Sequence, residues 1–576
     1  MSDTLRMQAF LTGKSFKIPS YQRDYAWTME EVNDLLSDIQ EALDTSTHHY
    51  LGTIVLAKVR GNFEIVDGQQ RLSTLMLLLH ALLIQLEISD PIRIADEIYL
   101  LKHGRLPKLD FGANQAFVVE LFSSTNPGPE TRGQRRLADA YRCCYERAQA
   151  LRSSGMDNIY LWLDAIKSLE IIAFYEENTG RAIRIFQSVN DRGRQLSDMD
   201  KAKALLVLYS NRFLDGSLDT EINESFGSCF ASYDRIREQA TQYGYKIDLI
   251  DRSNFSENDL LRYHYLAYDA AEANDYYGYS KTIIDHFLKP VLRERKTDAA
   301  SLRSFISDYI NDLKEFAESF AALVNSTRSS NRLFTLLVVH GLAARLYPIA
   351  IRMFQRNLLF VSVPGTAPSV DLLHCLETVD LRVYKIRGTD PARDIGHLSH
   401  ASRTATVAAM AERLRAFLLS FMPDSLMATH LGGRVYKSGA AVPILLAFEQ
   451  NYTGHAHPME TLVALVQQGP TQEHILSQEP SFDCTSRGFT GDAEFEEYLD
   501  RIGNLSLLTS SENTRCHNKS VELKISQQDL YPSSSFSGPR FLAQEFSVSG
   551  AMFGKQAVIN RTERLIQFAL SKWAIW

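Results

Sequence analysis

The chain has 576 residues, a formal net charge of −8 and a pI near 6.0, which excludes a protein coated in basic residues but leaves room for local basic grooves. Six cysteines without a Cys-x-x-Cys pair exclude a disulfide framework and favour a reducing compartment. The N-terminus lacks the apolar core of a signal peptide, and the most apolar long segment, residues 72–88, is interrupted by His80 and Gln85. We therefore expect a cytoplasmic protein without a membrane partner, built from about two to four domains.

The first hundred residues predict an α/β domain. Residues 28–44 have helical apolar spacing, and Glu31 follows Thr28 at the capping-box distance. Residues 50–68 predict a β-hairpin with an Arg-Gly-Asn turn. The apolar segment from residue 72 onward follows the hairpin directly, and we expect it to form a buried helix.

The chain is mostly helical from about residue 85 to 460. Residues 181–213 predict a helix, a polar break at 190–193 and a second helix that Ser197 caps, with Asp200 in its first turn. A further break is expected near Pro348, and the chain closes with a helix that has an apolar stripe. The expected division is an α/β domain over residues 1–100, a helical region over 101–440 and a third domain over 441–576.

A cluster of polar residues in the last hundred positions suits phosphodiester hydrolysis. Glu473 and His474 stand at the end of an expected strand, and Asn504 and Asn513 follow. Hydrolysis needs a base that activates water and a hard cation that holds the phosphate. Mg²⁺ prefers carboxylate and amide oxygens, which glutamate and asparagine supply.

A second polar cluster begins at the expected turn between the hairpin and the apolar helix. A helix N-terminus attracts anions, and arginine adds a fixed positive charge with a bidentate fork. The cluster consists of Asp67, Gly68, Gln69, Gln70 and Arg71. It is therefore suited to bind a nucleotide phosphate or a nucleic-acid backbone. Upstream, aromatic residues alternate with polar ones in a pattern that suits base stacking and phosphate binding, namely Tyr21, Gln22, Arg23, Tyr25 and Trp27.

The C-terminal cluster resembles the HNH (ββα-metal) nucleases in their His-Asn-Asn variant. The resemblance lies in Glu473-His474-Ile475, in the Asn-Leu-Ser-Leu-Leu run that begins at Asn504, and in Asn513 nine residues later. It implies that His474 is the general base and that Glu473 and Asn513 bind a metal ion, Mg²⁺ or Mn²⁺. Asn504 is then expected to hold the loop or to orient His474.

Two lysines and one departure complete this comparison. Lys519 and Lys524 are the candidates for contacts with DNA phosphates. Ser477 stands where the family usually has proline, a residue that shapes the turn and does no chemistry. Because of this departure, the alternative that the C-terminal domain binds DNA without cutting it stays open.

The N-terminal half resembles the GmrSD-type modification-dependent (type IV) restriction enzymes. The resemblance rests on the runs "IPSYQRDYAW", "LGTIVL" and "VDGQQRLSTL". It continues in a motif between the two expected helices, formed by Phe186, Asn190, Arg192, Gly193, Leu196 and Asp200. The family order implies a ParB/sulfiredoxin-like N-terminal domain, a helical middle region and a C-terminal HNH domain, and hence an α+β multidomain protein.

This resemblance implies an endonuclease that is regulated by a nucleoside triphosphate and recognises modified phage DNA. The N-terminal domain is expected to bind and hydrolyse the nucleotide, and residues 190–200 are the candidate coupling element. One HNH site cuts one strand, so cleavage of both strands needs two events or a homodimer. Two alternatives stay open: a nucleotide or DNA sensor whose HNH-like domain does not cut, and an abortive-infection nuclease that acts on host nucleic acid.

Overall fold

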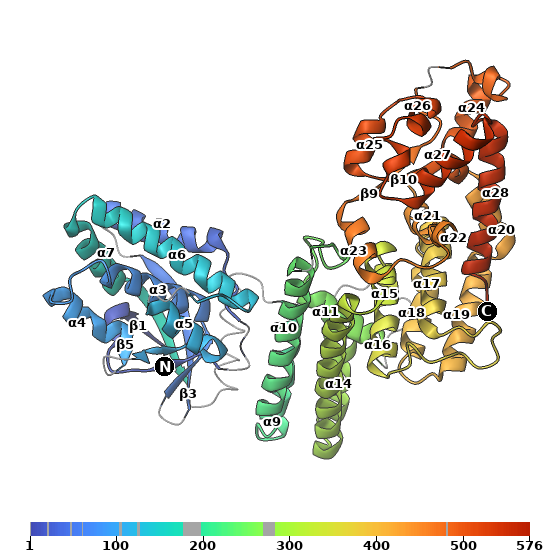
Figure 1. Cartoon of the computed structure of the whole chain (residues 1–576). Helices are drawn as coiled ribbons and strands as arrows, with labels where there is room; N and C mark the ends of the chain where they lie inside the picture. Colours follow the sequence, from blue (N-terminus) through green and yellow to red (C-terminus); the bar gives the residue numbers. More distant parts are fainter. Residues whose placement is uncertain are drawn as a thin grey trace. The chain divides into compact units, whose positions relative to one another are not determined.

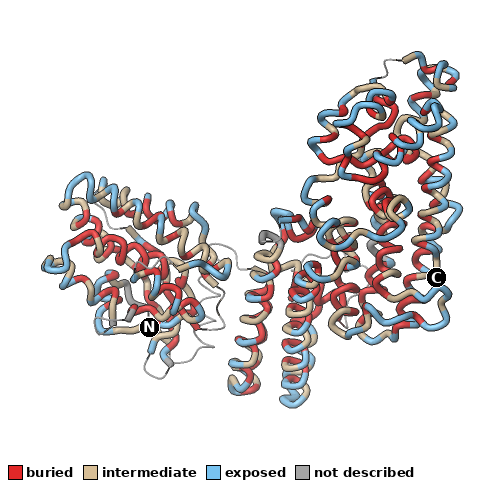
Figure 2. The backbone as a smooth tube through the Cα atoms, viewed as in Figure 1, coloured by how far each residue is buried: buried red, intermediate tan, exposed pale blue. Residues whose placement is uncertain are grey.

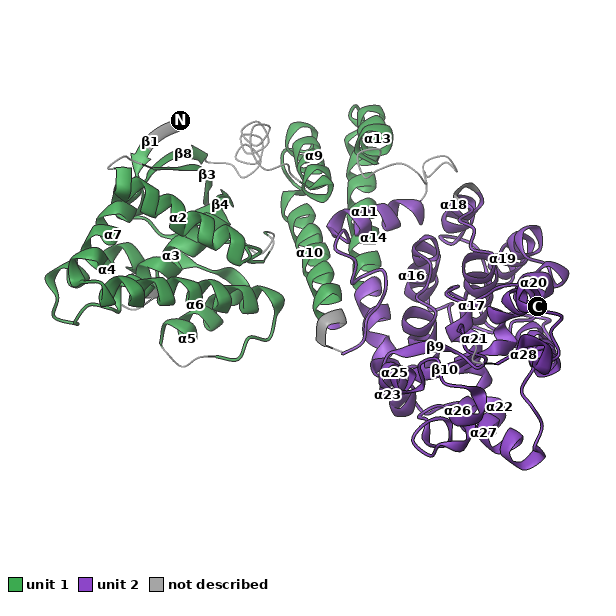
Figure 3. Ribbon diagram, turned by 90° about the horizontal axis from the view of Figure 1, so that it is seen from above, with its two compact units in different colours: residues 1–238, 280–318 green, residues 239–279, 319–576 purple. Residues whose placement is uncertain are grey.

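The chain folds into two compact units, Met1–Glu238 with Ser280–Glu318 and Gln239–Tyr279 with Ser319–Trp576 (Figure 3). The computed structural model describes residues 2–19, 22, 24–45, 49–59, 62–102, 106–123, 127–176, 197–242, 244–268, 283–479 and 482–576. Within these ranges, helices and strands alternate in the N-terminal part and helices dominate the rest, so the expected α+β class is confirmed. No described helix has the length and apolar character needed to cross a membrane.

A mixed six-stranded sheet forms the centre of the N-terminal part, with strand order β1-β8-β3-β4-β2-β7. β8 is antiparallel to β1 and parallel to β3, while β2 is parallel to both β4 and β7. β3 and β4 form the antiparallel pair that the sequence predicts. The strands are β1 (Ser2–Arg6), β2 (Phe16–Lys17), β3 (Tyr50–Val59), β4 (Asn62–Asp67), β7 (Leu109–Asp110) and β8 (Glu170–Glu176), and β5 (Leu101–Lys102) pairs separately with β6 (Leu106–Pro107).

Helices pack beside this sheet around one apolar core. In Figure 1, α2, α3, α6 and α7 lie together next to the strands, and they contact one another. α3 is buried along nearly its whole length, as its composition predicts. His80 interrupts its apolar run but is stacked on Phe122 and hydrogen-bonded to Tyr141 at 2.8 Å, and burial lowers its pKa to about 4. The helices are α1 (Met7–Leu11), α2 (Met29–Thr45), α3 (Gln69–Leu83), α4 (Pro91–Leu100), α5 (Gln115–Phe122), α6 (Arg132–Ser153) and α7 (Met156–Ser168).

Longer helices complete the first unit. They are α9 (Asp198–Phe213), α10 (Asp219–Gln242), α13 (Lys289–Arg295) and α14 (Ala299–Asn325), and the last residues of α10 and α14 belong to the second unit. The start of α9 is the one predicted, because the hydroxyl of Ser197 accepts a hydrogen bond from the amide of Asp200 at 3.1 Å.

Among its described residues, the second unit is helical apart from one two-stranded antiparallel sheet. Figure 2 shows buried residues on the inner sides of its helices and exposed residues on their outer sides. The break expected near Pro348 is present, since α16 begins at Tyr347. The helices are α11 (Glu257–Leu266), α15 (Asn331–Phe334), α16 (Tyr347–Gln355), α17 (Leu372–Val379), α18 (Ala392–Ala401), α19 (Val407–Phe421), α20 (Asp424–Gly432), α21 (Ala441–Phe448), α22 (Gln450–Thr453), α23 (Met459–Gln467), α24 (Asp492–Leu499), α25 (Ser510–Cys516), α26 (Val521–Ser526), α27 (Ser537–Ser549) and α28 (Lys555–Lys572).

The two-stranded sheet pairs β9 (Pro470–His474) with β10 (Leu505–Thr509), and α25 follows β10 directly. The strands are antiparallel, with Leu505 opposite His474 and Ser506 opposite Glu473. Thr509 begins α25 through a capping box with Glu512. A small apolar core that includes Ile475, Leu476 and Leu508 lies beside this element. The pairing with β10 and the packing beside α25 therefore position the end of β9.

A buried ion pair holds the end of β9 against α26. The Oε1 atom of Glu473 lies 2.6 Å from Nζ of Lys524, and the hydroxyl of Tyr531 donates to the same oxygen at 3.4 Å. The ammonium also donates to the carbonyls of His474 at 2.7 Å and Ile475 at 3.3 Å. The Lys524 side chain is fully buried. Burial raises the pKa of Glu473, and the charge of Lys524 offsets part of that rise.

We predict that Lys524→Met lowers the free energy of unfolding by about 3–5 kcal/mol, because it leaves the Glu473 carboxylate buried without its counter-ion. Urea unfolding followed by circular dichroism measures this loss. The double variant Glu473→Gln, Lys524→Met removes both charges and should recover most of the stability. Lys519→Met, at a more exposed position, is the control, and equal stability of the two single lysine variants would contradict the prediction.

Candidate functional site

His474 ends β9 and its side chain is only 7% exposed. Its Nε2 atom lies 3.0 Å from Oδ1 of Asp500, and its ring centroid lies 4.2 Å from that of Tyr436. An ionised carboxylate can only accept hydrogen bonds, so Nε2 carries the proton of this contact. Nδ1 of a neutral ring then keeps its lone pair, and this atom has no hydrogen-bond partner among the residues that the structure describes.

Arg434 fixes the carboxylate of Asp500 from the other side. Its Nη2 and Nε atoms donate to Oδ2 at 2.7 and 3.0 Å. The backbone carbonyl of Asp500 accepts from the amides of Val435 at 2.9 Å and Tyr436 at 3.3 Å. Burial alone would raise the pKa of Asp500, but the hydrogen bonds from Arg434 and His474 outweigh it and leave the pKa below its usual value. The segment that begins at Arg434 is therefore held to Asp500, with Tyr436 against the imidazole.

The surroundings of His474 favour the neutral imidazole. Burial is the largest effect and lowers the pKa, the Asp500 carboxylate opposes it, and the positive charges of Lys524 and Lys437 lower it further. The result is a pKa below the usual value for histidine. At neutral pH the ring is therefore unprotonated at Nδ1 and can accept a proton there.

The side chain of Asn504 forms three hydrogen bonds with described residues, none of them with His474. Its Oδ1 accepts from the amide of Leu476 at 2.8 Å, and its Nδ2 donates to the carbonyls of Leu476 at 3.2 Å and Leu499 at 2.8 Å. The side chain is completely buried. Asn504 was expected to hold the loop or to orient His474. Its hydrogen bonds with Leu476 hold the loop after β9. Asp500, which the sequence did not single out, makes the contact with His474.

One of the two expected metal ligands, Glu473, is already paired with a cation. Successive side chains of a strand point to opposite faces, so Glu473 points away from His474. Its carboxylate contacts the ammonium of Lys524. Asn513 lies half-buried on α25. Within the described ranges, no group of three or more histidine, cysteine, aspartate or glutamate side chains could hold a metal ion. A metal at Glu473 does not fit this arrangement, because Lys524 already supplies a cation there.

The two candidate lysines differ in position. Lys524 is fully buried, so the expected contact with a DNA phosphate does not fit its place in the fold. Lys519 is half-buried, and its ammonium donates to the carbonyl of Arg515. Ser477, at the departure from the family pattern, donates from its hydroxyl to the carbonyl of Lys519 at 2.7 Å. Lys519 therefore stays a candidate for DNA contact.

The motif at residues 67–71 surrounds the start of α3. Gly68 precedes the helix with a φ of 90°, a conformation that favours glycine, and its amide donates to Oδ1 of Asp67 at 2.7 Å. Arg71 donates to the carbonyl of Leu51 at 3.1 Å and lies 3.5 Å from Oδ2 of Asp67. Gly52 makes room for it, because a Cβ there would lie 2.1 Å from Nη1 of Arg71. The guanidinium is thus held against β3.

The glutamines of this motif have different roles. Gln70 accepts from the amide of Ala26 at 2.9 Å and donates to the carbonyl of Asp24 at 3.2 Å. It therefore holds the segment that carries Tyr25 against α3. Gln69 is buried and lines a cavity.

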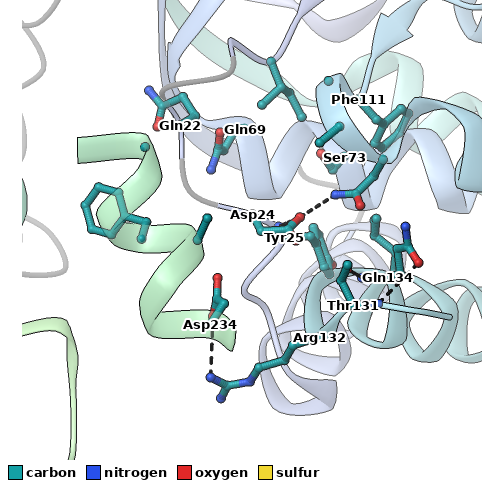
Figure 4. A pocket seen from close by; sticks show the side chains of 18 of the residues that line it. Gln22, Asp24, Tyr25, Gln69, Ser73, Phe111, Thr131, Arg132, Gln134 and Asp234 are labelled. Atoms are coloured by element: carbon teal, nitrogen blue, oxygen red, sulfur yellow. Dashed lines mark hydrogen bonds and ion pairs between the residues drawn. The ribbon is translucent and has the colours of Figure 1, made fainter. Parts of the chain in front are cut away.

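This cavity, of about 340 Å³, lies within the first unit between N-terminal elements and α10 (Figure 4). Tyr25 forms part of its wall, and its hydroxyl shares a hydrogen bond of 2.7 Å with that of Thr74. The lining is Ile18, Pro19, Gln22, Asp24, Tyr25, Gln69, Gln70, Ser73, Phe111, Gly112, Ala113, Asn114, Thr131, Arg132, Gln134, Leu137, Gly227, Phe230, Ala231, Asp234, Arg235 and Glu238. Aromatic, amide and carboxylate side chains thus face one space.

The charges of this lining do not favour a triphosphate. The acidic side chains are Asp24, Asp234 and Glu238, and the basic ones are Arg132 and Arg235. Arg132 already lies 3.6 Å from Asp234. A slightly acidic cavity with amides and aromatic rings suits an uncharged, hydrogen-bonding group better than several phosphates.

Several expected site residues lie outside the described residues: Tyr21, Arg23, Asn190, Arg192 and Gly193. Asp200 is described, and its Oδ2 accepts from the hydroxyl of Ser197 at 2.8 Å, in the first turn of α9. Trp27 packs against the apolar core and is not part of the cavity lining.

Asp500, Arg434 and Tyr436 were missed by the sequence analysis. Asp500 lies 26 residues after His474 in the chain, and Arg434 lies 40 residues before His474. No short spacing links them. The nearest signal was the position of Asp500, four residues before the Asn504 of the recognised motif.

Two family comparisons cover both sites. The family described as GmrSD restriction endonuclease, N-terminal domain, matches residues 7–207, which contain the 67–71 motif. The family described as GmrSD restriction endonucleases, C-terminal domain, matches residues 435–568, which contain His474 and Asp500. A comparison with curated proteins finds no match. The two matched ranges together span more than half of the chain, in the order that the sequence predicts. The chain therefore belongs to the GmrSD restriction endonuclease family and is a restriction nuclease with DNA as its substrate.

Proposed function

We propose that the chain is a modification-dependent, type IV restriction endonuclease in which His474 is the general base of phosphodiester hydrolysis. The observation that carries this proposal is the 3.0 Å contact between Nε2 of His474 and Oδ1 of Asp500. It leaves Nδ1 as the basic atom at the end of β9, within the range matched by the C-terminal family.

In this proposal Nδ1 of His474 takes a proton from the attacking water. Asp500 keeps the proton on Nε2 and stabilises the imidazolium that forms, because a carboxylate attracts that charge. Arg434 holds the carboxylate in place through its paired hydrogen bonds. Tyr436 limits the ring to one orientation.

The antiparallel pairing of β9 with β10, and α25 directly after β10, support an HNH-like assignment of the C-terminal domain. The mixed sheet is compatible with a ParB/sulfiredoxin-like N-terminal domain. A divalent metal, Mg²⁺ or Mn²⁺, stays in the proposal on resemblance alone, since the carboxylate of Glu473 is paired with Lys524. The same Glu473–Lys524 pair favours the second candidate function, a DNA sensor whose HNH-like domain does not cut. An abortive-infection nuclease that acts on host nucleic acid remains the third.

We assign recognition of modified phage DNA to the cavity beside Gln69. Its amide and aromatic lining suits an uncharged group on a base. The nucleoside triphosphate is assigned to the motif at residues 67–71 on its sequence pattern alone, and Asp67, Gly68 and Arg71 of this motif lie outside the cavity lining. Coupling is assigned to residues 190–200. Cleavage of both strands would use a homodimer.

We predict that His474→Ala lowers DNA cleavage by about 10²–10⁴-fold, the usual contribution of a general base. The substrates are modified and unmodified phage genomic DNA, with Mg²⁺ or Mn²⁺ and with or without nucleoside triphosphate, and cleavage is followed on gels.

His430→Ala, at an exposed position on α20, is the matched control and should cleave like the wild type. Undiminished cleavage by His474→Ala would overturn the proposal. A wild-type protein that cuts none of these substrates but hydrolyses nucleotide would favour the sensor.

We also predict that Ala231→Trp weakens binding of modified DNA at least about tenfold, because the indole would fill the cavity from an exposed position on α10. Thr220→Trp, exposed on the same helix and away from the cavity, is the control. Fluorescence anisotropy with modified and unmodified duplexes measures both. Equal affinities of the two variants for modified DNA would refute this assignment of the cavity.

A further inference from the structure

A second cavity, of about 320 Å³, lies in the helical part of the second unit. It is lined by residues of α15, α17, α21, α22, α23 and the end of α28. None of the site residues discussed so far takes part in it. Its polar lining includes Asn331, His340, His374, Glu377, His457 and Lys572. Three histidines around one cavity call for an explanation beyond packing.

Polar atoms of three lining residues are buried without a hydrogen bond to any described residue. They are Oδ1 of Asn331, Nδ1 of His340 and Nε2 of His457. The nearest carboxylates are too distant to bond, since His457 lies 4.0 Å from Glu449 and His340 lies 3.7 Å from Asp380. Buried polar groups nearly always have a partner. A polar molecule in the cavity would supply a partner for Oδ1 of Asn331, whereas the two histidine nitrogens lie nearest to carboxylates outside the lining.

One cationic side chain of the lining has no counter-ion among the described residues. Lys572 is half-buried and forms no ion pair with a described residue. Arg332 also lines the cavity, where it is held by Asp371 at 2.6 Å. Burial lowers the pKa of His374, Glu377 opposes this, and the positive charges of Lys572 and Arg332 lower it further. Because Asp371 neutralises Arg332, the ammonium of Lys572 is the group of this lining that can bind an anion. Glu377, the acid of the lining, already accepts from Nε1 of Trp573 at 2.8 Å.

We propose that this cavity binds a free nucleoside monophosphate. The phosphate would lie between the ammonium of Lys572 and the imidazole of His374. The heterocycle would lie against the apolar side chains of Val339, Leu446 and Leu462, within reach of the polar atoms of Asn331 and His457. The volume is at the lower end of the range for ligand cavities and too small for a nucleic-acid chain. The site goes beyond DNA cleavage, since it gives the helical part of the chain a small-molecule ligand.

The test is equilibrium dialysis of the full chain with adenosine, guanosine and cytidine monophosphates, and with inorganic phosphate. We expect at least one nucleotide to bind more tightly than inorganic phosphate. Lys572→Ala should weaken that binding about tenfold, which corresponds to about 1.4 kcal/mol. Lys555→Ala, on the same helix but outside the cavity, should leave it unchanged.

Ala456→Trp provides an independent test, because this lining residue is exposed and its enlargement blocks the cavity without disturbing the core. It should abolish the binding that Lys572→Ala weakens. Binding that neither variant alters would come from another site, including the motif at residues 67–71, and would overturn the proposal. Absence of nucleotide binding by the wild type, or inorganic phosphate bound as tightly as the nucleotides, would overturn it as well.

Discussion

The alternation of side chains along β9 is the constraint on which the C-terminal site depends. Glu473 and His474 are neighbours in the chain but face opposite sides of the strand. On one side, Lys524 neutralises Glu473 and also binds the carbonyl of His474, so the backbone at the strand end is fixed from within the core. On the other side, Nε2 of the imidazole donates a hydrogen bond to Asp500. A buried structural ion pair and an acid–base pair thus share one short strand.

The second part of the site comes from distant segments of the chain. Arg434 precedes the helices that lead to β9, and Asp500 follows α24, yet their side chains meet beside His474. The backbone hydrogen bonds between these two segments hold Tyr436 against the ring. The imidazole therefore has a defined tautomer and orientation before any substrate arrives. Such preorganisation is what a general base requires.

Local features of the structure could be predicted from the sequence. The β3–β4 hairpin, the buried α3 and the start of α9 at Ser197 each depend on neighbouring residues, so apolar spacing and capping preferences are sufficient. Asp500 could not be found in this way, because its contact with His474 exists only after β9 and β10 pair. The expected metal role of Glu473 followed from the family resemblance, and a sequence motif does not show that a buried lysine already occupies that side of the strand. The cavity beside Gln69 likewise requires α10, about 150 residues further along the chain.

The central claim is that burial keeps His474 neutral while Asp500 fixes its single ring proton on Nε2. The pH dependence of DNA cleavage by the wild type and by Asp500→Asn tests it most directly. Activity should rise with pH through a histidine pKa below the usual value, because the base works only when unprotonated. Asp500 raises that pKa, so Asp500→Asn should lower the maximal rate and move the acidic limb to lower pH. An acidic limb that stays at the same pH in the variant would contradict the account.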